Sequence, residues 1–209
     1  MIAIVDYGVG NIHSAMKGLR RFTDDVTLSE DADVLRTADA LVLPGQGSFE
    51  AGMKGLNVRG LTATVREFAA TGKPILGICL GAQLLLERGY EFGDWEGLGF
   101  LPGTVVHFPP LRGGAKIPHM GWNSIEEASS GKWNGTALQG ITNGADMYFI
   151  HSYILQPKQH EHILAETEYG GLRFPSVIGA GNILGCQFHP EKSATEGLRI
   201  IENFVRIVR

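Results

Sequence analysis

A cysteine between two glycines is the part of the sequence whose spacing most directly predicts chemistry. Cys79 stands in Gly77-Ile78-Cys79-Leu80-Gly81, directly after the apolar residues 74–76. This spacing is typical of a nucleophile elbow, a strained turn that joins a buried strand to a helix. A Cβ on either side would clash, and the helix N-terminus favours a thiolate. We therefore expect Cys79 to be a nucleophile; the alternative is a buried structural cysteine.

A histidine and a glutamate two residues apart can supply the base and the group that orients it. They lie in Phe188-His189-Pro190-Glu191-Lys192-Ser193, after a strand-like segment. On an extended backbone, stiffened by Pro190, His189 and Glu191 point the same way. The imidazole then faces the thiol while the carboxylate holds its tautomer. A His-x-Glu pair alone is usually a surface pair, so the cysteine elbow is what favours catalysis.

Attack on a carbonyl by such a thiolate creates an oxyanion, which needs backbone N–H donors worth on the order of 3 kcal/mol each. One donor is expected to be Leu80, the residue after the nucleophile. The other is expected from the backbone of Gly45, Gln46 and Gly47, which follow Pro44 at the end of a predicted strand. The alternative for this segment is an ordinary Pro-Gly turn.

Composition limits the classes of protein to consider. The chain has 209 residues, 44% hydrophobic and 19% charged, which fits one globular domain, residues 1–209. With a formal charge of −4 and scattered basic residues, no nucleic-acid partner is expected. We expect no signal peptide, no membrane contact and a reducing, cytoplasmic location.

The remaining cysteine and a pair of histidines do not predict further sites. Cys186 has no elbow around it and is expected to be a small core residue on a strand. His160 and His162 lie in a charged stretch without a third ligand at a recognised spacing, which predicts a solvated turn. We expect no metal and no cofactor.

The elements that must position these groups change character halfway along the chain. In the first half, strands are expected at residues 2–5, 26–29, 40–43 and 74–78, and helices at 12–22 (capped by Asn11), 61–70 and 81–88. This alternation predicts a mostly parallel sheet flanked by helices on both faces. In the second half, strands at 104–108, 117–125, 147–155, 162–169 and 177–188 predict an added antiparallel portion, with an exposed loop at 126–140 and a last helix at 195–208.

Taken together, GICLGAQ around Cys79 and QFHPEKS around His189 resemble the class I (triad-type) glutamine amidotransferases over nearly the whole chain. Within that class, four stretches are similar to the glutaminase subunit of imidazole glycerol phosphate synthase, from histidine biosynthesis. They are DYGVGN from residue 6, KIPHMGWN from 116, YFIHSY from 148 and HPEKS from 189. The first two motifs indicate the class, and the PHMGWN and FIHSY stretches indicate the subunit.

The resemblance implies a single-domain flavodoxin-like α/β fold and a triad of Cys79, His189 and Glu191. It implies that Gln83, one helical turn after Cys79, grips the α-amino-acid end of L-glutamine together with Ser152 and Tyr153. For Gln83 alone, a solvated helix residue is the alternative. The resemblance also implies that the segment after Pro44 rearranges when the partner's substrate binds. Gln46 stands where the more familiar sequences have valine.

A partner is implied as well, because a glutaminase alone would waste glutamine. The resemblance makes it a (β/α)8-barrel cyclase that receives ammonia and forms imidazole glycerol phosphate and an aminoimidazole carboxamide ribotide. Candidates for the docking face are Asn11, Trp122, Tyr148 and Lys192, since aromatic residues suit an interface. The alternatives are core packing for Trp122 and an ordinary surface charge for Lys192.

Three other functions remain to be weighed. A glutaminase subunit for GMP, anthranilate or pyridoxal phosphate synthesis would share the triad and differ in its partner. A γ-glutamyl hydrolase or cysteine peptidase on the same fold would act alone. A non-catalytic binding subunit would have no use for the intact Cys79, His189 and Glu191.

Overall fold

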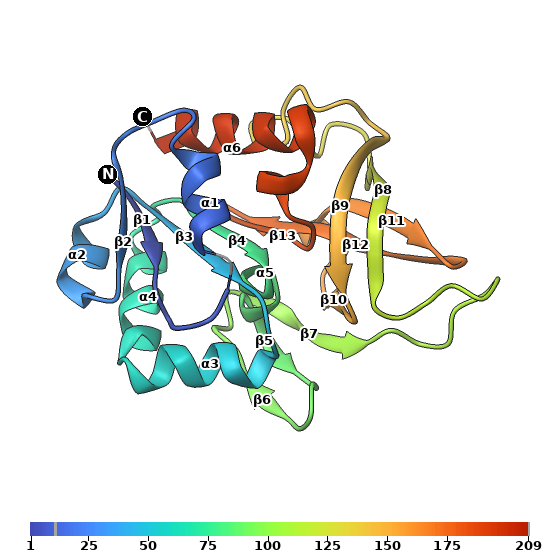
Figure 1. The fold of residues 1–209 in the computed structure, drawn as a ribbon, viewed down its shortest axis with the longest axis horizontal. Helices are drawn as coiled ribbons and strands as arrows, with labels where there is room; N and C mark the ends of the chain where they lie inside the picture. The colour runs from blue at the N-terminus through green and yellow to red at the C-terminus, as the bar shows by residue number, and fades with distance from the viewer. Residues whose placement is uncertain (11, 209) are drawn as a thin grey trace.

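The computed structural model describes residues 1–10 and 12–208 and is built around one nine-stranded sheet (Figure 1). In spatial order its strands are β2 (Val26–Ser29), β1 (Ile2–Val5), β3 (Ala40–Gly45), β4 (Ile75–Cys79), β13 (Ile183–Cys186), β12 (Leu172–Ala180), β11 (Ile163–Tyr169), β8 (His119–Glu127) and β9 (Ala145–His151). The pairings from β2 to β13 are parallel, and those from β13 to β9 are antiparallel. The order β2-β1-β3-β4-β13 is that of flavodoxin-like folds. The predicted α/β architecture, parallel with an antiparallel extension, is confirmed.

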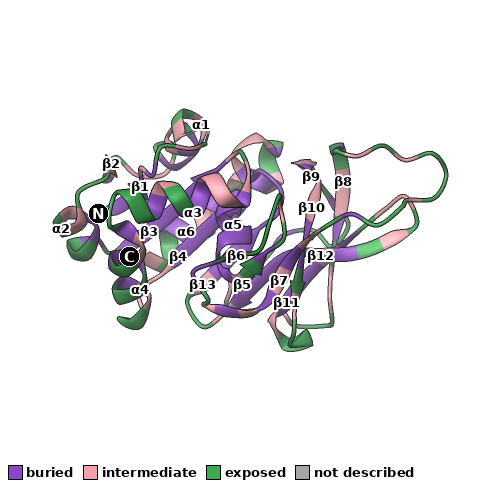
Figure 2. Ribbon diagram, turned by 90° about the horizontal axis from the view of Figure 1, so that it is seen from below, coloured by how far each residue is buried: buried purple, intermediate pink, exposed green. Residues whose placement is uncertain are grey.

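Alternating side chains of the parallel strands pack into two separate cores, one on each face of the sheet. On one face, Ile2 and Ile4 of β1 pack with α1 (Ile12–Leu19) and α6 (Ala194–Val208). On the other, Ala3 and Val5 pack with α2 (Ala32–Thr37), α3 (Phe49–Val58), α4 (Leu61–Ala70) and α5 (Leu80–Leu84). Strands buried on both faces cannot alternate in polarity, which is why they read as continuous apolar runs. Figure 2 shows these central strands in the colour of buried residues.

A second sheet of four strands was not predicted. In spatial order its strands are β10 (Tyr153–Pro157), β7 (Leu101–His107), β5 (Leu86–Gly89) and β6 (Trp95–Glu96). The predicted helix at 81–88 is therefore wrong in its second half: the helix ends at Leu84, and the chain continues as β5. Gly89 and Gly97 permit this change, because a Cβ at Gly89 would lie 2.3 Å from the Phe49 ring and one at Gly97 would lie 2.1 Å from the Leu86 oxygen.

Several predicted strand and loop boundaries differ from the observed ones, each because of a local feature of the structure. The predicted strand 147–155 is two strands in different sheets, β9 and β10, which are separated at Ser152. The predicted strand 177–188 turns at Gly181, whose φ is +56°, so that its parts belong to β12 and β13. The segment 126–140 is not simply exposed, since Trp133 and Leu138 are buried and the Trp133 Nε1 donates to the Leu164 oxygen at 2.9 Å.

Two further predictions concern the surface. The His160–His162 segment forms a short 3₁₀ turn in which none of the three side chains is buried. The predicted helix cap, Asn11, lies outside the described residues. Among the residues that the structure describes, no helix is long and apolar enough to cross a bilayer.

Candidate active site

The pairing of β4 with β13 brings together two segments that are far apart in the sequence. In the parallel register Ile78 faces Cys186, so both strands end at the same edge of the sheet. Cys79 is the last residue of β4, and His189 follows β13 by three residues. Carboxyl ends of neighbouring parallel strands are the usual location of ligand sites in such sheets.

Cys79 occupies a strained turn at the start of α5. Its φ and ψ are 54° and −107°, a conformation that side chains rarely adopt. The flanking glycines are required by contact: a Cβ at Gly81 would lie 1.8 Å from the Leu43 oxygen, and one at Gly77 would lie 2.7 Å from the Gly81 backbone. The predicted elbow is thus present, with the thiol at a helix N-terminus.

The segment after β13 positions a histidine and a glutamate, but by a different backbone from the one predicted. Pro190–Lys192 form a 3₁₀ turn rather than an extended strand. Its ends are held by two hydrogen bonds: the Ser193 hydroxyl donates to the His189 oxygen at 2.6 Å, and the Tyr148 N–H of β9 donates to the Ser193 hydroxyl at 2.9 Å. The turn still brings His189 Nδ1 to 2.8 Å from Glu191 Oε1.

The electrostatics of His189 reflect both of its neighbours. Burial opposes charging the imidazole, but the Cys79 sulfur and the Glu191 carboxylate outweigh it and raise the pKa of His189 to about 9. Nε2 is buried and forms no aligned hydrogen bond with a described residue, although the sulfur is near enough to act on the ring charge. The arrangement favours the imidazolium form of His189.

A cavity of about 370 Å³ opens in front of the sulfur. It is lined by Gln46, Gly47, Cys79, Leu80, Gln83, Glu91, Pro118, Ile150, His151, Ser152 and Tyr153. The predicted oxyanion and substrate-contacting residues other than Gly45 are all among them. Gly45 lies just behind this wall, since its Cα is in register with Cys79 across β3 and β4. Gln83 is buried, which is not the solvated helix position that was the alternative.

Four residues of this cavity, Glu91, Pro118, Ile150 and His151, were not predicted as site residues, and Glu91 is the acidic one. Glu91, between β5 and β6, is the only carboxylate among the lining residues. Burial raises its pKa, although the Phe49 N–H donates to Oε2 at 2.7 Å. No spacing relation links residue 91 to the elbow or to the histidine segment, because a separate sheet carries it to the cavity. No cluster of three metal-ligating side chains occurs in the part of the chain that the structure describes.

The segment that should supply the second oxyanion donor is held by neighbouring loops. The Tyr7 hydroxyl is buried and donates to the Pro44 oxygen at 2.5 Å. A Cβ at Gly45 would lie 2.6 Å from that hydroxyl, and one at Gly10 would lie 2.9 Å from the Gly45 Cα. The close packing fixes the direction of the Pro44 carbonyl and leaves Gln46 and Gly47 at the cavity.

Three of the predicted docking residues, Trp122, Tyr148 and Lys192, lie on β8, β9 and the turn after β13. Trp122 is 51% exposed, so core packing is excluded for it, and its ring meets that of Tyr148 edge-on with centroids 5.9 Å apart. Tyr148 in turn lies 6.5 Å from the His189 ring. Lys192 is half-buried, and Asn11 is outside the described residues. Met120, 63% exposed on the same face of β8 as Trp122, extends this surface.

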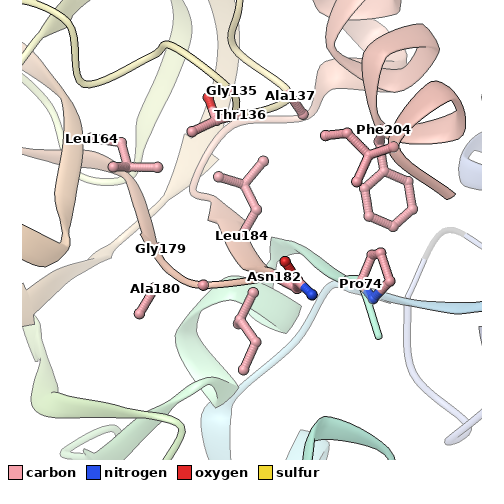
Figure 3. Close-up of a pocket in the computed structure, with 13 residues that line it drawn as sticks. Pro74, Gly135, Thr136, Ala137, Leu164, Gly179, Ala180, Asn182, Leu184 and Phe204 are labelled. Atoms are coloured by element: carbon pink, nitrogen blue, oxygen red, sulfur yellow. The ribbon is translucent and has the colours of Figure 1, made fainter. Parts of the chain in front are cut away.

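A second pocket lies at the opposite end of the same strands (Figure 3). It has a volume of about 150 Å³ and is lined mostly by small and apolar side chains, including Pro74, Leu184 and Phe204. The Asn182 amide is used to bind the Gly72 oxygen. Without a nucleophile or an ionisable side chain in its wall, this pocket does not compete with the cavity at Cys79.

Comparisons with known proteins agree with this geometry. Residues 3–208 match the family described as Glutamine amidotransferase class-I. Imidazole glycerol phosphate synthase subunit HisH 1 of Legionella pneumophila (strain Lens) is 44% identical over 210 residues, 99% of each chain. Subunit HisH of Moorella thermoacetica is 44% identical over 208 residues, 100% of this chain and 95% of the relative.

Solved structures support the fold alone, because their sequence identities are low. A crystal structure of a glutamine amidotransferase has a TM-score of 0.74 at 20% identity and covers 99% of this chain and 98% of its own. PurLQS from Thermotoga maritima has a TM-score of 0.73 at 18% identity, with 100% and 98% covered. With its full-length relatives at 44% identity, the chain belongs to the class-I glutamine amidotransferases and, within them, to the HisH glutaminase subunits of imidazole glycerol phosphate synthase, the family of histidine biosynthesis.

Proposed function

We propose that this chain hydrolyses L-glutamine to glutamate and ammonia through a thioester on Cys79. The observation that carries the proposal is the shared edge of β4 and β13, where a strained, cavity-facing thiol lies beside an imidazole held by a carboxylate. The thiolate attacks the side-chain carbonyl, and His189 protonates the departing ammonia. His189 then activates water to release glutamate, while Glu191 keeps the imidazole oriented.

The oxyanion of each tetrahedral intermediate forms at the N-terminus of α5. Leu80 N–H is one donor, because it follows the nucleophile and lies in the cavity wall. The backbone of the Gly45-Gln46-Gly47 segment supplies the other. Tyr7 holds the neighbouring Pro44 carbonyl, so we infer that reorienting this segment is the step that switches the enzyme on.

The far end of the cavity binds the amino-acid end of the substrate. Gln83, Ser152 and Tyr153 offer hydrogen-bonding groups there. Glu91 is the residue we assign to the α-ammonium group, since its carboxylate lies in the cavity wall and burial raises its pKa. Binding of a cation restores the charged form that burial disfavours, and so lowers the pKa of Glu91.

Ammonia released at Cys79 is used by a partner. We propose a (β/α)8-barrel cyclase docked on the surface formed by Met120, Trp122, Tyr148 and Lys192, with Asn11 as a further candidate. Exposed aromatic residues beside a catalytic cavity are suited to a binding surface. The cyclase takes up the ammonia to form imidazole glycerol phosphate and the aminoimidazole carboxamide ribotide. Both cysteines are free, which is compatible with a cytoplasmic location.

The test is coupled synthesis with a purified cyclase. Glutamine hydrolysis should be much faster in the complex with the cyclase's nucleotide ligand than in the free subunit. Cys79→Ala should abolish synthesis from glutamine and leave synthesis from ammonium salts intact. Equal hydrolysis with and without the cyclase would instead support a hydrolase that acts alone, such as a γ-glutamyl hydrolase.

A further inference from the structure

A chain of polar side chains that runs from His151 in the cavity wall to Asn123 on β8 has no part in the proposed chemistry. His151 Nδ1 lies 2.8 Å from the Tyr153 backbone oxygen, and His151 Nε2 lies 3.0 Å from His119 Nδ1. His119 Nε2 in turn lies 2.8 Å from Asn123 Oδ1. His119 is fully buried and His151 is 6% exposed. Buried polar groups of this kind are costly unless all of their hydrogen bonds are formed.

Two neutral imidazole rings do not carry enough protons to make all three hydrogen bonds of this chain of side chains. Both ends, the Tyr153 carbonyl and Asn123 Oδ1, are acceptors, so three hydrogen bonds need three ring protons. Two neutral imidazoles carry only two. The chain is complete in two ways: with one extra proton, or with the Asn123 amide turned so that Nδ2 donates to His119. With Oδ1 toward His119, Asn123 Nδ2 donates to the Glu168 oxygen at 3.3 Å, a bond that is lost when the amide turns.

Surrounding groups favour the neutral form. Burial lowers the pKa of His119 and lowers that of His151 to about 3. The titratable groups that face the pair are Tyr169 of β11, whose ring stacks on His119 with centroids 4.0 Å apart, and His189, whose charge opposes protonation of His151. The other rings around the pair, Phe108, Phe149 and Phe174, carry no charge. With two protons and the amide turned, every bond runs from Asn123 toward Tyr153.

The Tyr153 carbonyl at the end of this chain is shared with the active site. Gln83 Nε2 donates to it at 3.4 Å and to Gln187 Oε1 at 3.3 Å, and Gln187 Nε2 lies 4.0 Å from the Cys79 sulfur. We propose that Asn123, His119 and His151 are positioning residues that fix the Tyr153 carbonyl and, through Gln83, the glutamine-binding wall of the cavity. The proposal rests on the glutaminase function proposed above.

His119 and Asn123, the first part of this chain of side chains, lie on β8, the strand that also forms the docking surface. His119 and Asn123 project inward from β8, whereas Met120 and Trp122 are exposed on its other face. His119 lies directly opposite His151 in the pairing of β8 with β9, so a displacement of β8 on docking would be passed through His151 to the Tyr153 carbonyl. This gives a physical connection between partner binding and glutamine affinity.

Matched variants at residue 151 test the bond to Tyr153 in the complex with the cyclase. Asn has an amide where histidine has Nδ1, so His151→Asn retains the donor, whereas His151→Leu has a similar size and none. We expect the KM for glutamine to rise about tenfold in His151→Leu, which loses the bonds to both Tyr153 and His119, and less than threefold in His151→Asn, which loses only the bond to His119. Thr167→Val, which removes a buried bond to the Ser124 oxygen outside this chain, should leave KM unchanged.

Asn123→Asp tests the proton count. A carboxylate only accepts hydrogen bonds, so in this variant one imidazole ring must carry the third proton if the bond to the Tyr153 oxygen is to form. We expect KM for glutamine to increase with pH between 6 and 8 in Asn123→Asp relative to wild type, and this dependence to vanish in His151→Asn/Asn123→Asp.

Equal KM values for His151→Asn and His151→Leu, or a pH-independent ratio for Asn123→Asp, would overturn the proposal. These outcomes are separable from failure of the proposed function, in which the wild-type complex itself would not hydrolyse glutamine. Denaturant unfolding of each variant keeps a simple loss of stability apart from a loss of positioning.

Discussion

The ends of β4 and β13 each carry a buried cysteine, and the two differ in backbone conformation and in access to the cavity. Cys186 has regular strand geometry and full burial, which raises the pKa of its thiol. Cys79, next to the residue that pairs with Cys186, has a φ of 54° and faces the cavity from a helix N-terminus. The comparison indicates that the shape of the strand end, rather than the residue type, decides which thiol is suited to be the proposed nucleophile.

The largest contrast between the two strand ends should be in activity. Cys79→Ala removes the attacking atom, so glutaminase activity of the complex should fall by on the order of 10⁴-fold or more. Cys186→Ala should keep activity within about threefold, because that side chain is fully buried in the core and does not line the cavity, although Glu191 is near enough to act on its thiol. Steady-state glutamate release measures both. A comparable loss in the two variants would remove the distinction drawn here.

The end of β13 contributes the orienting carboxylate, which Glu191→Gln tests. The amide keeps the shape but not the charge that holds the His189 tautomer, so kcat should fall by roughly 10²–10⁴-fold. Synthesis from ammonium salts by the complex serves as the control and should not change. A kcat near the wild-type value would show that the 2.8 Å contact is only structural.

Glycines at the two strand ends should differ in their tolerance of a methyl group. A Cβ at Gly81 meets the Leu43 backbone oxygen at 1.8 Å, whereas one at Gly185 meets side-chain atoms of Leu85 and Ala82 at 2.9 and 3.0 Å. Gly81→Ala should therefore cost more than about 3 kcal/mol of unfolding free energy, and Gly185→Ala about 1–2 kcal/mol. Urea unfolding followed by circular dichroism measures both values. Similar losses of unfolding free energy in the two variants would mean that the turn at Cys79 adjusts easily to an added methyl group.

The pH dependence of stability should report the His189 environment. Because its pKa is raised to about 9, its stabilising contribution is complete below the unfolded value near 6.5 and is lost as pH rises through about 9. In Glu191→Gln the folded pKa falls, so the decline between pH 6.5 and 9 should be shallower than the upper limit of about 1.4 kcal/mol per unit. The contribution of Cys186 to the free energy of unfolding also falls as pH rises, in the wild type and in Glu191→Gln alike. The difference between the two stability curves therefore reports His189. Parallel curves would contradict this assignment.

The smallest expected effect is on Cys186 itself. Cys186→Ala removes one buried sulfur from the core and should lower the free energy of unfolding by about 1 kcal/mol. Alkylation of the native protein with iodoacetamide should label Cys79 and spare Cys186, as mass spectrometry of the peptides would show. Labelling at both positions would indicate that the core opens near β13.

Much of this site could be predicted because its signals are local. The glycines around Cys79 and the short His-x-Glu spacing each follow from one strand end, and the apolar strands read clearly because they are buried on both faces. The 3₁₀ turn at Pro190 was less visible, because it is held by Ser193 and by Tyr148 of another strand.

The features that escaped prediction depend on contacts between distant segments. The apolar residues 84–86 continue the helical pattern of α5, but the helix ends at Leu84, and pairing with β6 and β7 makes Leu86–Gly89 a strand. Glu91 reaches the cavity through that second sheet, and Trp133 enters the core from a polar loop by bonding to the Leu164 oxygen. Tertiary packing overrides local preference in each case.

The register of β4 with β13 also has a consequence for how the protein acquires activity during refolding. The whole second sheet and the antiparallel strands are inserted between those two strands, so the sulfur and the imidazole meet only through a contact of very long sequence separation. Such contacts form late and slow the folding of a domain. A newly collapsed chain can thus carry a formed elbow before it has a base, and catalysis should emerge only in the final kinetic phase, after most secondary structure is in place.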